Sequence, residues 1–288
     1  MKPGILYFGY IHPNNEQGLN LLKTKLGIEV FRIGGRDCID NYKGDWIVLS
    51  LDSPCPNTYE GKLVICGPHF FPIGVNFPII FNGLGDWVRE MVGKLPNVMA
   101  LSVYFPLDCE LYREDKESND YVVVYTKHRH PNDINKVLQI AHDYCGNTVK
   151  HFDYNIRYNF KTWMDTLRKT RYCIWFGSSE SQGFAMQEVL ANNIPIILID
   201  CEYWSWIYPQ DPSTQIIENI IQEKIPSTSA TIWSEKCGVK TTIDNLHEKI
   251  IEMELRYMEY LPRTFVKNNL EPSVIYEKYN KYFMEYKI

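Results

Sequence analysis

Two glutamates, Glu180 and Glu188, lie in the segment CIWFGSSESQGFAMQEVLANNIPIILID, which covers residues 173–200. A Ser-Gly turn lies between a predicted strand and a helix expected to begin near Phe184. The N–H groups and positive dipole end of a helix start attract anions, and Gly183 lets a ligand approach the backbone. A carboxylate is also a common acceptor for ribose hydroxyls. The pattern therefore predicts a phosphate or diphosphate bound between two acids.

A second explanation of the same residues needs no ligand. Ser179 or Ser181 would cap the helix, and acids near a first helical turn stabilise the helix dipole. The segment taken alone leaves both explanations open.

The elements that must position these residues follow a regular pattern. Strand-length apolar runs alternate with amphipathic segments, which is typical of parallel sheets with crossover helices. Strands are predicted at 4–10, 28–33, 44–52, 61–68, 77–83, 98–105, 121–127, 148–154, 171–177 and 194–200. Helices are predicted at 18–27, 86–95, 133–145, 158–170, from Phe184, at 245–261 and at 271–286.

A polar, turn-rich segment at 106–120 divides the pattern into two series. The sequence therefore predicts an N-terminal Rossmann-like lobe at 1–110, a C-terminal Rossmann-like lobe at 119–262, and a tail helix within 263–288. Ligands of open α/β sheets bind beyond the carboxyl ends of the strands. Two such lobes would face each other across a cleft.

Composition narrows the class of protein. The 288 residues carry a net charge of -5, so a nucleic-acid partner is not favoured. The eight cysteines form no C-x-x-C pair and are interpreted as free thiols in a reducing compartment. No apolar run approaches the roughly 18 residues of a spanning helix. We expect a cytoplasmic protein, and peripheral attachment to a membrane stays open.

The run Glu180-Ser-Gln-Gly-Phe, followed by Glu188 and VLANNIPIILID, resembles the donor-binding segment of retaining glycosyltransferases of the GT-B fold, in the family 4-like group (glycosyl transferases group 1). Asn193 stands where the family has Gly, and Asn tolerates the same left-handed helix end. Gln182 replaces the usual Phe. Residues 82–112, 121–131 and 260–288 are similar as well, whereas 1–81 resemble the family poorly.

The resemblance implies a GT-B enzyme whose C-terminal helix returns to the first lobe. It implies transfer of a sugar from a UDP-, GDP- or ADP-linked donor to an unidentified hydroxyl acceptor, with retention and without metal or cofactor. The implied catalytic residues are Glu180, Lys127, Arg129 and His69. The implied donor-binding residues are Glu188, Ser181, Gln182, Gly183, Phe184 and Tyr154.

Each of these roles has a rationale or a competitor. Glu188 would hold the ribose, and Glu180 the donor sugar and its cationic transition state. Lys127 and Arg129, with Lys136 as a third candidate, would neutralise the diphosphate, although solvated loop charge is the plainer interpretation. His69, in GPHFFP, would touch the donor sugar or be an ordinary loop histidine.

Metal binding is not predicted. His128 and His130 lack a third ligand, and the chain contains no Asp-x-Asp. Trp204, Trp206 and Tyr208 could stack on a sugar or cap a sheet edge, and the sequence favours neither.

Three other functions stay open. They are an epimerase of the same fold, a non-catalytic subunit that binds a nucleotide sugar, and a glycosyltransferase acting on modified DNA bases. The last would need a basic groove.

Overall fold

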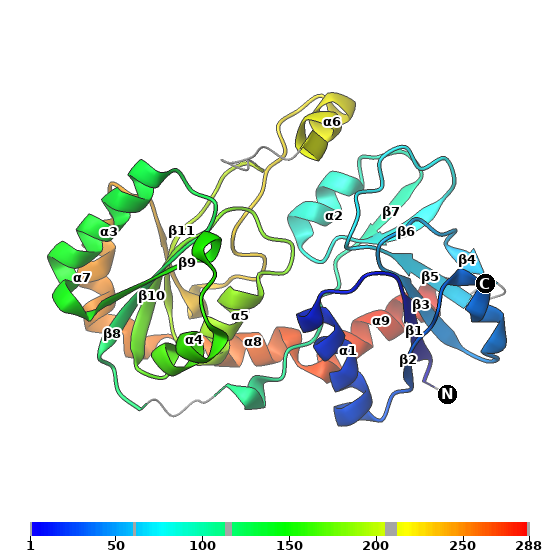
Figure 1. Ribbon diagram of the computed structural model, residues 1–288, viewed down its shortest axis with the longest axis horizontal. Coiled ribbons are helices and arrows are strands. Elements are labelled where there is room, and N and C mark those ends of the chain that lie inside the picture. The colour runs from blue at the N-terminus through cyan, green and yellow to red at the C-terminus, as the bar shows by residue number, and fades with distance from the viewer. Residues whose placement is uncertain (1, 60–61, 113–116, 205–211, 287–288) are drawn as a thin grey trace. The chain divides into compact units, whose positions relative to one another are not determined.

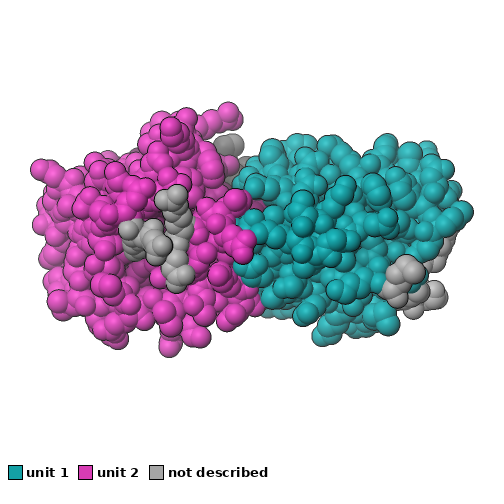
Figure 2. All heavy atoms as spheres, turned by 90° about the horizontal axis from the view of Figure 1, so that it is seen from below, with its two compact units in different colours: residues 1–108, 216–223, 269–288 teal, residues 109–215, 224–268 magenta. Residues whose placement is uncertain are grey.

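The computed structural model describes residues 2–59, 62–112, 117–204 and 212–286 (Figure 1). The chain forms two compact units, each built around its own sheet. The first contains residues 1–108, 216–223 and 269–288, and the second contains residues 109–215 and 224–268 (Figure 2). Helix α6 (Pro212–Ile221) crosses the division.

The first unit has a sheet of order β2-β1-β3-β5-β6-β7, and β4 pairs antiparallel with β5. Its elements are β1 (Gly4–Phe8), α1 (Pro13–Leu26), β2 (Val30–Arg32), β3 (Trp46–Ser50), β4 (Thr58–Tyr59), β5 (Lys62–Cys66), β6 (Ile79–Asn82), α2 (Asp86–Val92), β7 (Val98–Leu101) and α9 (Pro272–Tyr286). Every residue of β1, β3 and β5 is buried, as expected of parallel strands covered on both faces.

Helix α1 begins five residues earlier than the sequence pattern predicted. It starts at Pro13, because Pro13 needs no N–H partner at the first helical position and the side chain of the N-cap residue His12 accepts from Asn14 N. The helix ends at Gly27, whose φ is 65°. It contacts α9, so the chain's last helix lies against its first.

The second unit has an all-parallel sheet of order β12-β11-β10-β8-β9. Its elements are β8 (Tyr121–Thr126), α3 (Pro131–Cys145), β9 (Val149–Asp153), α4 (Phe160–Leu167), β10 (Thr170–Phe176), α5 (Phe184–Ala191), β11 (Ile196–Ile199), β12 (Gly238–Thr241), α7 (Leu246–Arg256) and α8 (Pro262–Leu270). The sequence pattern did not predict β12 or α6.

Alternate side chains of β8 face opposite layers. Val122 and Val124 are fully buried in a core that includes residues of α3 and α7. Tyr125 points to the other face, where it stacks on Trp175 and contacts Trp163 of α4. Helices α3 and α7 therefore cover one face of the sheet and α4 packs on the other, and the carboxyl ends of the strands share one edge.

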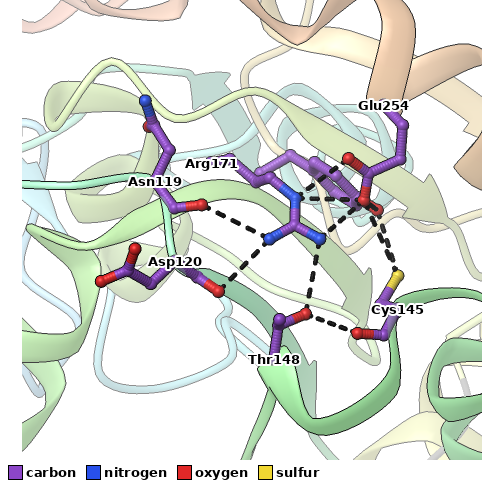
Figure 3. Close-up of polar contacts among 7 residues, drawn as sticks. Asn119, Asp120, Cys145, Thr148, Arg171 and Glu254 are labelled. Carbon is purple, nitrogen blue, oxygen red and sulfur yellow. Dashed lines mark hydrogen bonds and ion pairs between the residues drawn. The ribbon is translucent and has the colours of Figure 1, made fainter.

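Polar contacts of Arg171 join several elements near the amino ends of these strands (Figure 3). Its Nη2 lies 2.7 Å from Glu254 Oε1 of α7, and Nη1 donates to the carbonyls of Asn119 and Asp120. Nη2 also donates to Thr148 Oγ1. Because Arg171 is the second residue of β10, this cluster ties the sheet to α7 and to the loops at that edge.

No helix among the described residues is long and apolar enough to cross a membrane.

Candidate functional site

The turn between β10 and α5 carries the predicted anion site. Gly183 precedes the helix with φ 74° and ψ 48°, a left-handed conformation that a Cβ would strain. The N-cap residue of α5 is Gly183, so neither serine occupies the cap position, and Ser179 Oγ instead lies 2.7 Å from Ser227 Oγ. The explanation of the serines as helix caps is therefore wrong. The helix start is held by backbone geometry.

A segment that the sequence pattern did not single out, residues 226–231, fixes this turn. Glu180 N donates to Thr228 O at 3.0 Å, and Thr231 Oγ1 donates to Gln182 O at 2.7 Å. Gln187 Nε2 donates to the same carbonyl, also at 2.7 Å. The turn is therefore anchored from both sides, and Gln182 is buried.

Asp200, at the end of β11, anchors that segment in turn. It accepts from Thr228 Oγ1 at 2.7 Å and from Ser229 N at 2.8 Å. Burial alone would raise the pKa of Asp200, but these hydrogen bonds and the charge of Lys240 lower it. The sequence signal that could have indicated this anchoring role of Asp200 is an acidic residue directly after a predicted parallel strand.

The structure brings three of the predicted residues together. Lys127 Nζ lies 2.6 Å from Glu180 Oε1, and the two side chains are 13% and 15% exposed. The same ammonium lies 4.2 Å from the centre of the Tyr154 ring. Two strand ends, β8 and β10, thus place a cation and an anion in contact at the carboxyl edge of the sheet.

Arg129 bonds the backbone at the ends of two strands. Its Nε donates to Gly177 O at 2.8 Å and its Nη2 to Ile199 O at 3.1 Å. The guanidinium lies over the Phe176 ring, and burial lowers its pKa. Arg129 thus ties the ends of β10 and β11 while placing positive charge beneath the turn.

The third basic candidate, Lys136, lies on α3 and bonds Asp244 Oδ1 at 2.9 Å, with both side chains more than half exposed. For Lys136, the structure therefore agrees with the alternative of an ordinary solvated charge.

Glu188 lies in the second turn of α5 and is only 7% exposed. Its Oε2 accepts from Trp163 Nε1 at 2.9 Å. Burial raises the pKa of Glu188 to about 7, although the Trp163 hydrogen bond opposes this. Sequence reasoning missed Trp163, because nothing in the primary sequence pairs a residue of α4 with one of α5.

Asn193, just past α5, has φ 57°. The prediction that Asn adopts the left-handed helix end usually given to Gly is confirmed.

His69 belongs to the first unit and follows β5. Its Nε2 accepts from the backbone N–H of His12 at 3.4 Å and lies 3.3 Å from Asn15 Nδ2. Since a backbone N–H can only donate, Nε2 is the unprotonated nitrogen and Nδ1 carries the proton. Burial, and next the charge of His12, lower the pKa of His69, which favours its neutral form.

The histidines after β8 have other partners. His130 accepts from Asn132 N at the start of α3, and the His128 ring packs edge-on against Tyr154. Within the described ranges, no three His, Cys, Asp or Glu side chains are grouped as metal ligands. Trp204 is buried, whereas Trp206 and Tyr208 lie outside the described residues.

No family model matches the sequence, and no curated protein matches it. Solved structures do. AviGT4, a glycosyltransferase involved in avilamycin A biosynthesis, superposes with a TM-score of 0.60 at 12% identity over 98% of each chain. The lipopolysaccharide outer core galactosyltransferase WaaB gives 0.56 at 9% identity, covering 98% of this chain and 99% of that one. S. aureus TarM gives 0.50 at 12% identity, covering 86% of this chain and 57% of its own.

These likenesses cover nearly the whole chain and show two parallel-sheet α/β domains of the GT-B fold. The predicted fold class is confirmed.

Proposed function

We propose that the protein is a glycosyltransferase that moves a sugar from a nucleotide-diphosphate donor to a hydroxyl acceptor. The observation that carries the proposal is the arrangement around α5. The contact between Lys127 and Glu180 lies just before α5, which starts at the left-handed Gly183, and the buried carboxylate of Glu188 lies in the second turn of that helix. The GT-B fold of the chain supports the same assignment.

Each group has a role that its surroundings support. Glu188 accepts hydrogen bonds from ribose hydroxyls, and the backbone from Ser181 to Phe184 binds the diphosphate. Lys127 neutralises the diphosphate, and Arg129 adds fixed positive charge beneath the turn. Tyr154 lies beside Lys127 at the edge of this site. For His69, a donor through Nδ1, a hydrogen bond to the sugar stays a prediction from the resemblance.

The proposed reaction breaks the bond between the anomeric carbon and the diphosphate oxygen, which keeps the electron pair. The acceptor hydroxyl oxygen bonds to the anomeric carbon on the same face, and its proton passes to the departing diphosphate. Glu180 stabilises the positive charge that develops on the sugar ring. In this scheme lysine and arginine supply the positive charge that a metal ion supplies in other enzymes, so no metal is required.

Among the donors, UDP-sugars are the first to test. The S. aureus TarM structure, the third likeness above, holds UDP together with alpha-GlcNAc-glycerol.

The test is a thermal titration of the full chain with UDP-, GDP- and ADP-linked sugars. A ligand that binds only the native state raises the melting temperature, by RT ln(1 + [L]/Kd) in free energy. We expect one donor class to do so and to be hydrolysed slowly without acceptor. If none raises the melting temperature, the proposal fails. Binding without any hydrolysis or transfer would favour the non-catalytic binding subunit instead.

A further inference from the structure

The two carboxylate oxygens of Glu188 have different surroundings. Oε2 accepts from Trp163 Nε1, and Trp163 is fully buried. Within the described part of the chain, Oε1 has no hydrogen-bond partner. Four side-chain atoms there are fully buried and lack a partner, and Oε1 is not one of them. Oε1 therefore reaches the accessible surface while the rest of the side chain is buried. Such a carboxylate presents one directed acceptor to a ligand.

Trp163 is held rigidly enough to fix that direction. Helix α4 begins at a capped turn, where Asn159 Oδ1 accepts from Lys161 N at 2.8 Å. The indole packs against the rings of Tyr125 and Phe152, with centroids 5.9 Å and 4.9 Å away. Because an indole N–H can only donate, it favours the ionised form of Glu188, the form that accepts from a ligand hydroxyl.

We propose that Trp163 is a positioning residue of the donor site, whose indole N–H holds Oε2 of Glu188 and directs Oε1 toward a hydroxyl of the bound ribose. The identity of the ligand rests on the proposed function. The contact between Trp163 and Glu188 does not, so it can be tested without any ligand.

One neighbouring group could complicate a titration of Glu188. Tyr158, in the segment before α4, faces it, and Tyr154 and Glu180 also act on Tyr158. Burial and the charge of Glu188 raise the pKa of Tyr158 to about 12, so this phenol stays neutral below pH 9. Glu180 is in contact with Lys127. Glu188 is therefore the group whose charge next to the indole changes near neutral pH.

The ligand-free test follows the indole N–H signals of the seven tryptophans by NMR between pH 5 and pH 9. We expect one signal to move with a midpoint near 7, as the group that it donates to ionises. The movement should be absent in Glu188→Gln. If no indole signal titrates, or if the titration persists in Glu188→Gln, the proposal is overturned whatever the protein binds.

The functional test measures the Kd of UDP, GDP and ADP, which share the ribose, against pH for the wild type and Trp163→Phe. Loss of the hydrogen bond raises the pKa of Glu188, so we expect the pH at which binding becomes strong to rise by about one unit. Near neutral pH the affinity should fall about tenfold, and kcat for the donor should change much less. Phe152→Leu, which perturbs the same ring cluster without touching Glu188, is the control.

The two proposals fail in different ways. If the wild type binds none of the nucleotides, the proposed function fails and the NMR result still decides the role of Trp163. If the wild type binds and Trp163→Phe keeps the wild-type pH profile, or only matches Phe152→Leu, Trp163 has no positioning role. Should Trp163→Phe fail to fold, the NMR titration of the wild type and Glu188→Gln remains decisive.

Discussion

Two ion pairs of the second unit differ in what surrounds them. Arg171 and Glu254 lie near the amino ends of the strands (Figure 3). Arg171 also donates to two backbone carbonyls and to the Thr148 hydroxyl, and Glu254 also accepts from the Tyr172 hydroxyl. Lys127 and Glu180, at the carboxyl ends, meet between a loop and a turn, beside the ring of Tyr154. The first pair fastens elements together, whereas the second places opposite charges where ligands of such folds bind. Charge alone therefore does not identify a site, but its place on the sheet does.

The largest expected effect is on turnover. Glu180→Gln removes the negative charge that we assign to the transition state, so kcat should fall by roughly 100-fold or more. The amide oxygen can still accept from Lys127, and the free energy of unfolding should therefore change by no more than about 1 kcal/mol. Steady-state kinetics and denaturant unfolding measure the two. Unchanged turnover would show that the pair of Lys127 and Glu180, like the pair of Arg171 and Glu254, only holds the fold together.

Arg171→Met should act in the opposite way. It leaves Glu254, whose carboxylate also accepts from Tyr172, without its cation, and removes the bonds to two carbonyls. We expect a loss of about 2–3 kcal/mol in the free energy of unfolding. At a temperature where the variant is folded, kcat and donor affinity should match the wild type. A variant that is stable but inactive would contradict the assignment of a structural role to the amino edge of the sheet and of ligand binding to the carboxyl edge.

Glu188→Gln combines both kinds of effect. Donor affinity should fall about tenfold, because a neutral amide is a weaker acceptor for ribose hydroxyls than a carboxylate. Stability should rise. The folded-state pKa of Glu188 lies above its usual 4.5, so its cost to stability is absent below that pH, grows as the pH rises and is complete above about 7.

At pH 8 the gain in the free energy of unfolding should therefore approach about 3 kcal/mol, and at pH 5 it should be small. Urea unfolding at the two pH values measures this difference. If the difference in stability between Glu188→Gln and the wild type is the same at pH 5 and pH 8, Glu188 is not held in a buried, ionisable state.

The smallest effect is expected at the end of α5. Asn193→Gly relieves the left-handed conformation that Asn adopts at φ 57°, but Asn193 Oδ1 also accepts from Arg263 N at 3.4 Å. Stability should change by less than about 0.5 kcal/mol, and donor affinity should not change. Thermal unfolding and nucleotide titration measure both, and a large loss of affinity would place this residue in the site.

The sequence predicted the two-lobed fold because local signals carry it. Apolar runs mark the strands, and the turn with Gly183 marks the switch from strand to helix. It also brought Lys127 and Glu180 forward as candidates, since each follows a strand. It did not reveal that Arg129 bonds the ends of two strands, that Thr228 and Thr231 hold the turn, or that Trp163 holds Glu188. These are contacts between residues 25 to 70 positions apart, which only the fold brings together.

The most direct measurement of the central claim is calorimetric titration of UDP, GDP and ADP into the wild type, Glu188→Gln and Arg171→Met. We expect the wild type and Arg171→Met to bind one nucleotide with equal affinity and Glu188→Gln to bind it about tenfold more weakly. Equal affinities in all three proteins, or no binding by the wild type, would contradict a donor site at the carboxyl edge of the second sheet.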